Sequence, residues 1–212
     1  MRITNYKLFS IILIFLSVLS FFIGFIYGEN SAGAGTFNGD FDILWKNLQT
    51  FINNDLSIAI GYTTNINAEY YQSSRTPLLY IFHKFFNPFT ENKIYFIRSV
   101  FIFSFIAPIL FYLCLKQKFK GTENLLLVLV SCTIFLSPYF RTSAFWGLEE
   151  NFGIVFLLLS FFFLNKFILS NNKLSNYYLL FLTTFLSSLC LYFDQKLAIV
   201  PLICFLQIYF SN

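Results

Sequence analysis

The chain has 212 residues, of which 57% are hydrophobic and 11% are charged, and its mean hydropathy is +0.67. A soluble domain carries about 25% charged residues, so the composition excludes an ordinary water-soluble domain and indicates a polytopic membrane protein. The formal net charge of +4 is interpreted as a signal of membrane topology, so we expect a lipid bilayer and no nucleic acid as a partner.

Six apolar runs along the chain are candidates for membrane-spanning helices, each of which needs about 20 mostly apolar residues. In chain order the runs are 8–27, 99–115, 124–140, 151–165, 174–193 and 197–212. The second extends backwards if Arg98 lies at the interface, and the fourth extends forwards if Lys166 reaches the surface with its charged end. We therefore predict an all-α polytopic membrane protein with about six transmembrane helices, forming a single membrane domain over residues 1–212.

The first run has two interpretations. Arg2 and Lys7 precede it and small residues follow at 32–34, as in a cleaved signal peptide. The apolar core of a signal peptide is usually about 7–15 residues long, and this run is longer. We interpret it as a retained first helix.

Basic residues are concentrated in alternate connections. Segments 1–7, 116–123 and 166–173 together hold seven Lys and Arg and one acid, Glu123. Short cytoplasmic loops are enriched in Lys and Arg, so the N-terminus is predicted to be cytoplasmic. The chain also lacks the N-x-[ST] glycosylation sequence, which fits a bacterial inner membrane.

The first outer connection, residues 28–94, is long, and loops above about 15 residues are usually functional or disordered. Its many aromatic and aliphatic residues argue against disorder. Apolar side chains recur in it at positions 41, 44, 45, 48, 51 and 52. This helical spacing predicts an amphipathic helix that follows Asp40 directly, is entered by a turn at Gly39 and lies in the plane of the membrane interface.

A second short helix is predicted in the same loop, over residues 77–86. Thr76 is a suitable N-cap and Pro77 suits the first helical position. At about 10 residues this helix is too short to span a membrane, so we expect it to be interfacial or re-entrant. The polar, tyrosine-rich stretch 61–75 between the two helices is suited to binding.

Three groups of charged residues are predicted to lie on the outer side, close to the ends of helices. They are Asp40 with Asp42, the stretch 140–151 with Arg141, Trp146, Glu149 and Glu150, and Asp194 with Lys196. Their convergence on one side favours a functional site.

Each group also has an ordinary structural explanation. Asp40 and Asp42 could cap a helix or favour its dipole, and Glu149 and Glu150 could do the same for the fourth span. Arg141 and Trp146 could anchor the protein at the lipid headgroups. Asp194 and Lys196 could form a simple surface pair.

The remaining polar and sulfur-containing residues suggest less. His83 is interpreted as an interfacial residue in preference to a ligand. The four cysteines lie in predicted spans without a C-x-x-C pair, as small buried hydrophobes do. The spacing of the carboxylates supports no metal site, and although a divalent metal is conceivable, no cofactor is predicted.

Three stretches resemble one protein family. They are GDFDILW at 39–45, SRTPLLYIF at 74–82 and SPYFRTSAFWGLEENFG at 137–153. Together with the long first outer loop they are similar to the GT-C superfamily of membrane glycosyltransferases, which includes the protein O-mannosyltransferases and the lipid A aminoarabinose transferase. Family members carry Pro-Pro where this chain has Thr76-Pro77, and they have more spans. The resemblance therefore implies the N-terminal part of a longer module.

The resemblance also implies an activity. Such enzymes transfer a sugar from a polyprenyl-phosphate donor to a lipid, glycan or protein acceptor on the outer face of the membrane. By this analogy Asp40 is the general base, with Asp42 as the alternative. The residues expected to bind the donor phosphate or substrate are Arg75, Arg141, Lys196, Glu149, Glu150, Asp194, Trp146 and Tyr80.

Two other functions are kept open. A transporter or flippase for a lipid or sugar would place ionisable side chains near the middle of its spans. This sequence interrupts its apolar runs only near their ends, at Arg98 and Lys166. The third possibility is a truncated membrane protein without catalytic activity.

Overall fold

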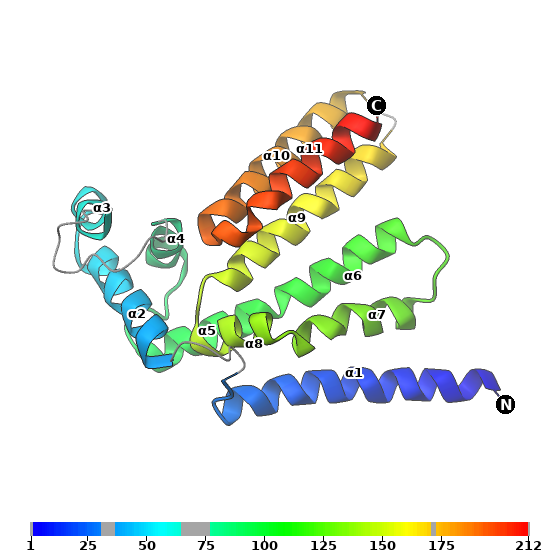
Figure 1. Ribbon diagram of the computed structural model, residues 1–212, viewed down its shortest axis with the longest axis horizontal. Coiled ribbons are helices and arrows are strands. Elements are labelled where there is room, and N and C mark those ends of the chain that lie inside the picture. The colour runs from blue at the N-terminus through cyan, green and yellow to red at the C-terminus, as the bar shows by residue number, and fades with distance from the viewer. Residues whose placement is uncertain (1, 31–36, 65–76, 171–172, 212) are drawn as a thin grey trace.

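The structure, a computed structural model, describes residues 2–30, 37–64, 77–170 and 173–211, and in these ranges it contains helices and no strands (Figure 1). The first six α-helices are α1 (Arg2–Ile26), α2 (Phe37–Asn53), α3 (Leu56–Thr64), α4 (Leu78–Phe86), α5 (Lys93–Ser104) and α6 (Ile106–Lys118). They are followed by α7 (Asn124–Cys132), the 3-10 helix η1 (Thr133–Leu136), α8 (Pro138–Trp146), α9 (Glu150–Leu169), α10 (Lys173–Phe193), the 3-10 helix η2 (Gln195–Ala198) and α11 (Ile199–Ser211).

The long helices form a fan, with the short helices gathered at one end (Figure 1). α1 packs on α7, α7 on α6, and α6 on α9, which also contacts α10 and α11. Aromatic rings fill the centre of the first group: Phe21 of α1 is fully buried and packs on rings from α5, η1 and α8. The four cysteines are buried and unpaired.

Four helical segments are long and apolar enough to cross a membrane: Tyr6–Ile26, Lys93–Lys118, Glu150–Leu169 and Asn176–Phe193. A fifth crossing is added if Asn124–Leu136 and Pro138–Trp146, which are bent by 65°, count as one span. The sixth predicted span corresponds to a shorter apolar helix, Gln195–Phe210. The protein is therefore all-helical, with four to five helices suited to spanning a bilayer.

The third predicted span is the one that the structure bends. Its backbone tightens to a 3-10 helix at Thr133 and becomes extended at Ser137, because the residue before a proline is disfavoured in helical conformation. Pro138 then opens α8, and the Ser137 side chain accepts a hydrogen bond from the Phe140 amide at 3.5 Å. The expectation that the third span runs straight to residue 140 was wrong, since α8 carries the chain on as a separate helix that ends at Trp146 and is capped by Gly147.

The amphipathic helix of the first loop is α2, but it begins at Phe37, so Gly39 and Asp40 lie in its first turn. The prediction that Asp40 precedes the helix was therefore wrong. Phe41, Leu44 and Leu48 on its apolar stripe are at most 1% exposed, because this face packs against other helices, chiefly α4.

The second predicted helix of the loop is α4, with Pro77 immediately before it; Thr76 lies outside the described residues. Between α2 and α4 the chain forms a further helix, α3, where the sequence predicted a polar loop from Gly61. Lys84 fastens α4 to the end of α2, because its ammonium donates to the carbonyls of Phe51 and Asn54, both at 2.7 Å. These carbonyls belong to the last turn of α2 and to the residue beyond it, where helix carbonyls lack intrahelical partners.

The basic segments meet at one end of the fan, here called the lysine end. Lys7 of α1 pairs with Glu123 at 3.1 Å, and residues 117–122 face 165–169 across a cavity of about 460 Å³. The other end, formed by α2, α3, α4, α8 and η2, is called the short-helix end. The basic segments that the sequence assigned to one side of the membrane therefore lie together at this end.

Candidate active site

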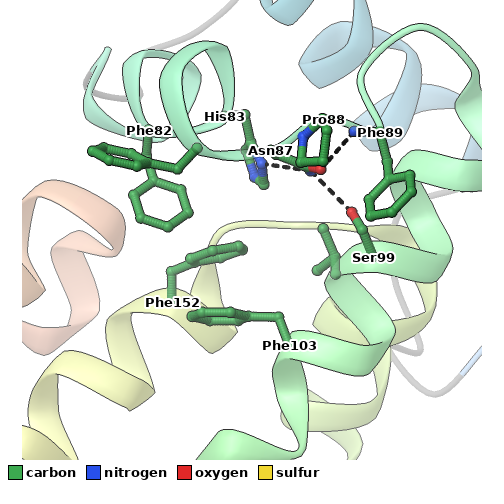
Figure 2. A pocket seen from close by; sticks show the side chains of 10 residues that line it. Phe82, His83, Asn87, Pro88, Phe89, Ser99, Phe103 and Phe152 are labelled. Atoms are coloured by element: carbon green, nitrogen blue, oxygen red, sulfur yellow. Dashed lines mark hydrogen bonds between the residues drawn. The ribbon is translucent and has the colours of Figure 1, made fainter.

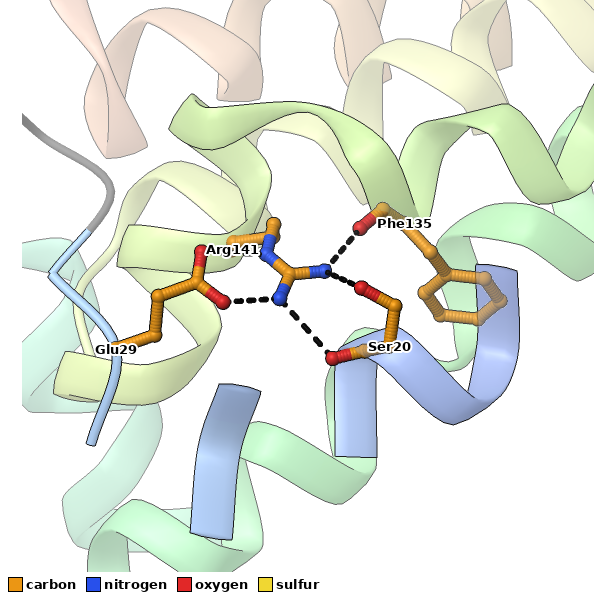
Figure 3. A network of polar contacts seen from close by, with 4 residues as sticks. All are labelled: Ser20, Glu29, Phe135 and Arg141. Atoms are coloured by element: carbon orange, nitrogen blue, oxygen red, sulfur yellow. Dashed lines mark hydrogen bonds and ion pairs between the residues drawn. The ribbon is translucent and has the colours of Figure 1, made fainter. Parts of the chain in front are cut away.

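Arg141 is held inside the short-helix end by a dense set of contacts (Figure 3). It lies on α8 and its side chain is 7% exposed. Its guanidinium donates to both carboxylate oxygens of Glu29, with Nε to Oε1 at 2.9 Å. It also donates to the backbone carbonyls of Ser20 and Phe135, both at 3.0 Å. Five donors in a fixed fork suit this arrangement, which ties α8 to α1 and η1.

The close fit of this ion pair depends on Gly24 in α1. A Cβ at this position would lie 2.4 Å from a guanidinium nitrogen of Arg141 and 2.5 Å from Oε2 of Glu29. Both distances are shorter than any normal contact, so a side chain here would displace the pair. A glycine is therefore required at position 24 because no larger side chain fits there, and not because of its backbone conformation.

The two acids of α2 have different environments. Asp42 pairs with Lys93 at the start of α5, with Nζ to Oδ1 at 2.8 Å, and its side chain is 45% exposed. Asp40 is half-buried and, within the described part of the chain, makes no hydrogen bond or ion pair. The structure thus gives different environments to the two carboxylates, Asp40 and its alternative Asp42.

Asp194 and Lys196, at the start of η2, both contact Tyr139 of α8. The Tyr139 hydroxyl donates a hydrogen bond to Oδ2 of Asp194, and Oδ1 of the same carboxylate accepts from the Lys196 amide at 3.0 Å. The Lys196 ammonium lies 4.8 Å from the centre of the Tyr139 ring, which favours the cation. Because Tyr139 and Arg141 are two residues apart, α8 connects the ion pair at α1 with the group at η2.

The remaining residues of the 140–151 stretch are buried around α8 and the start of α9. Trp146 and Glu149 are 4% and 6% exposed, so Trp146 is part of the protein core. Glu150 lies in the first turn of α9, where a carboxylate is favoured by the helix dipole. Its Oε2 atom is buried without a hydrogen-bond partner in the structure.

Tyr80 and His83 of α4 are also interior residues. Tyr80 is 1% exposed, and its hydroxyl accepts from the Asn47 amide at 3.2 Å. His83 is 2% exposed, so it is an interior side chain of the protein and does not lie on its surface. Burial lowers the pKa of His83 to about 3, because the charged form loses hydration. Arg75 lies outside the described residues.

The structure therefore brings most of the predicted residues to one end, but it uses several of them to hold helices together. Sequence reasoning missed Glu29, Tyr139 and Lys93, the partners of Arg141, Asp194 and Asp42. Each lies far along the chain from its partner, and although Tyr139 belongs to the stretch 137–153 noted above, nothing in the sequence indicates which residue any of the three contacts. Among the described residues, no group of three or more His, Cys, Asp or Glu side chains is placed to hold a metal ion.

Comparison with protein-family models, with curated proteins and with solved structures finds no match to this chain.

Proposed function

We propose that the protein is a membrane glycosyltransferase that moves a sugar from a polyprenyl-phosphate donor to a lipid, glycan or protein acceptor at the short-helix end. In this proposal the N-terminus and the lysine end face the cytoplasm of a bacterium, and the short-helix end faces outwards. The observation that carries the proposal is the state of Asp40, a half-buried carboxylate at the start of α2 without a polar partner in the described chain.

A general base must be ionised and must be able to reach the proton of the acceptor hydroxyl. Asp42 is already paired with Lys93 at 2.8 Å, which occupies one of its oxygens. Asp40 keeps both oxygens for an acceptor. We therefore assign the base role to Asp40 and treat Asp42 as the residue that holds the start of α2 against α5.

The departing phosphate needs positive charge. Arg141 is engaged by Glu29 and by backbone carbonyls, so we assign it to positioning α8. Lys196 is exposed and its only recorded side-chain contact in the described chain is the ring of Tyr139, which leaves its three donors for phosphate oxygens. Arg75 remains a second candidate on sequence grounds.

A transporter is the less favoured alternative. Transporters place ionisable residues near the bilayer midplane. In the long spans that the structure describes, Arg98 is the sixth residue of Lys93–Lys118 and Lys166 the fourth from the end of Glu150–Leu169. Neither position is central, so no observation favours transport over transfer.

The test compares Asp40→Asn with Asp42→Asn in membranes that contain the protein. Transfer of radiolabelled sugar from a panel of polyprenyl-phosphate sugars to extractable membrane acceptors is measured. Loss of a general base costs about 10²–10⁴ in rate, so Asp40→Asn should lose at least about a hundredfold. Asp42→Asn, which removes a surface pair, should keep activity within about tenfold.

Two outcomes contradict different parts of the proposal. If Asp40→Asn transfers sugar at the rate of the unmodified protein, Asp40 is not the base, although the protein is still a glycosyltransferase. Absence of transfer by the unmodified protein with every donor of the panel removes the glycosyltransferase itself. Equal expression of the variants, checked by immunoblot, excludes loss of protein as the reason for either result.

A further inference from the structure

A cavity of about 210 Å³ lies between α4, α5 and α9, and no charged side chain is among the residues that line it (Figure 2). Its walls are mostly aromatic: Phe82 comes from α4, Phe103 from α5 and Phe152 from α9, and the last two rings stack at 4.2 Å. Three polar side chains share the lining, His83, Asn87 and Ser99. An apolar space with a few convergent polar groups is the usual form of a small-ligand site.

The hydrogen bonds of Asn87 fix the state of His83. The Oδ1 atom of Asn87 accepts from the Phe89 amide at 2.9 Å, so the other end of its side chain is the NH₂ group. That group lies 2.9 Å from the Ser99 hydroxyl oxygen and 3.0 Å from Nδ1 of His83. Because the NH₂ group only donates, Nδ1 must be the acceptor.

A neutral imidazole carries one proton, so an accepting Nδ1 places that proton on Nε2. Burial keeps the ring neutral, since it lowers the pKa of His83 to about 3. Nε2 is buried and has no hydrogen-bond partner among the described residues. The ring packs in T-shaped contacts with Phe152 and Phe96, at 5.1 Å and 4.8 Å between centroids. The hydrogen bond from Asn87 thus occupies Nδ1 of His83, and the N–H at Nε2 makes no hydrogen bond within the described chain.

We infer that this cavity binds the ester-linked end of a membrane lipid acyl chain, with the ester carbonyl accepting from Nε2–H of His83. A neutral donor in apolar surroundings suits a neutral acceptor better than an anion, because no charge is then buried. A cavity of about 150 Å³ holds a benzene molecule, so this one accommodates an ester group with its first methylenes.

The position of the cavity supports a lipid over a water-soluble ligand. α4 is too short to span, and its cavity lies against the first half of the Lys93–Lys118 span, at Ser99, Val100 and Phe103. Phe86 and Phe89, which also line the cavity, are 73% and 53% exposed. Exposed apolar side chains grouped beside a span are typical of a surface that contacts the membrane. The inference does not depend on the proposed sugar transfer.

The experiment uses the full chain reconstituted in phosphatidylcholine vesicles that contain a trace of a photoreactive phospholipid. The photoreactive group sits on the first methylenes of the acyl chain, and an ester-linked probe is compared with its ether-linked analogue. Peptides carrying the adduct are identified by mass spectrometry. We expect adducts on Phe82, Phe103 or Phe152, with the ester probe favoured roughly fivefold to tenfold, as one hydrogen bond provides.

His83→Phe is the decisive variant, because it keeps an aromatic ring and removes the donor. It should still label, but with equal yields for the ester and ether probes. Tyr112→Phe is the matched control: it removes a hydroxyl from α6, whose nearest recorded partner is Asn124 at 3.4 Å, and should keep the ester preference. Thermal unfolding of both variants checks that they are folded.

Three results would overturn the inference. The unmodified protein could give no adduct on the cavity walls, which would mean that aromatic rings or water fill the space. It could label there with equal yields of ester and ether probe, which would mean that no carbonyl is recognised. His83→Phe could keep the full ester preference, which would assign recognition to another donor.

Discussion

The cation of the ion pair at the short-helix end is far more buried than the cation at the lysine end. Arg141 is 7% exposed at its side chain and holds Glu29, which is 36% exposed, together with two backbone carbonyls. Lys7 and Glu123 are 50% and 39% exposed and are joined by a single contact at 3.1 Å. Removing the partner of a buried charge leaves that charge without compensation, whereas water replaces the partner of an exposed one. Burial of the cation, and not the number of charges, thus decides where charge matters for stability.

The largest effect should follow from Glu29→Ala. This change leaves the buried Arg141 with no countercharge. Removing one partner of a fully buried pair costs about 3–5 kcal/mol, and because Glu29 is itself 36% exposed we expect a loss at or below the lower end of that range. Glu123→Ala is the matched change at the lysine end and should cost much less, because water replaces the lost contact of an exposed pair. Equilibrium unfolding in mixed detergent micelles measures both. Equal losses would show that the two ends are alike and contradict the comparison.

A double substitution tests whether the cost arises from the unpaired charge. Arg141→Met combined with Glu29→Gln removes both charges while keeping similar volumes. Apolar replacement of a buried pair is often neutral, so the double variant should be more stable than Glu29→Ala. A double variant that is less stable would mean that the carbonyl contacts of Arg141, and not its charge, dominate.

The next effect in size concerns the space around the buried pair. Gly24→Ala places a Cβ 2.4 Å from a guanidinium nitrogen of Arg141, and such overpacking costs about 1–3 kcal/mol. Gly61→Ala in α3 is the matched change, because nothing lies within 4 Å of its added Cβ. It should stabilise by about 0.5–1 kcal/mol, the usual gain of Ala over Gly in a helix. The same unfolding measurement applies, and a neutral Gly24→Ala would mean that the pair can move aside.

The sequence predicted the parts of this fold that follow from local patterns. Apolar runs of spanning length gave the positions of α1, α9 and α10, and the helical spacing of apolar residues gave α2. Each of these helices can be predicted from its own segment alone, because the spacing of its apolar residues shows a buried face and the length of an apolar run shows a span.

The missed features depend on residues that are distant in the sequence or on overlooked local signals. The pairing of Arg141 with Glu29 joins positions 112 residues apart, and neither has a neighbour that indicates the other. The start of α8 was different, because Ser137 followed by Pro138 is a recognisable helix start. This helix start was overlooked because the apolar run continues through Phe140. An apolar composition indicates a span whether the helix is straight or bent.

A pH dependence distinguishes the buried α4 from the exposed groups of the lysine end. The pKa of His83 is about 3 in the folded protein and about 6.5 in an unfolded chain. Between these values the unfolded state binds more protons, so the free energy of unfolding falls as pH falls below about 6.5. The loss should reach up to about 2 kcal/mol at pH 5, from about 1.4 kcal/mol per pH unit.

His83→Phe should remove this slope, because it has no group to titrate there. Glu123 provides the contrast, since the Tyr6 hydroxyl and then the Lys7 ammonium hold its pKa below the usual value. Glu123 contributes to the free energy of unfolding above pH 4.5, and this contribution is lost only as the pH falls further. Glu123 therefore adds no pH dependence to the free energy of unfolding between pH 6.5 and pH 5. An unchanged slope in His83→Phe would assign the titration to another residue.

The smallest effect is expected at the exposed pair of the short-helix end. Lys93→Gln removes the partner of Asp42, and both side chains are about half exposed, at 50% and 45%. Exposed pairs contribute about 0.2–1 kcal/mol and are screened by salt. The loss measured in low salt should therefore shrink as ionic strength rises, while the loss in Glu29→Ala should not. A large, salt-independent loss for Lys93→Gln would show that α2 is held by this contact and not by its buried apolar face.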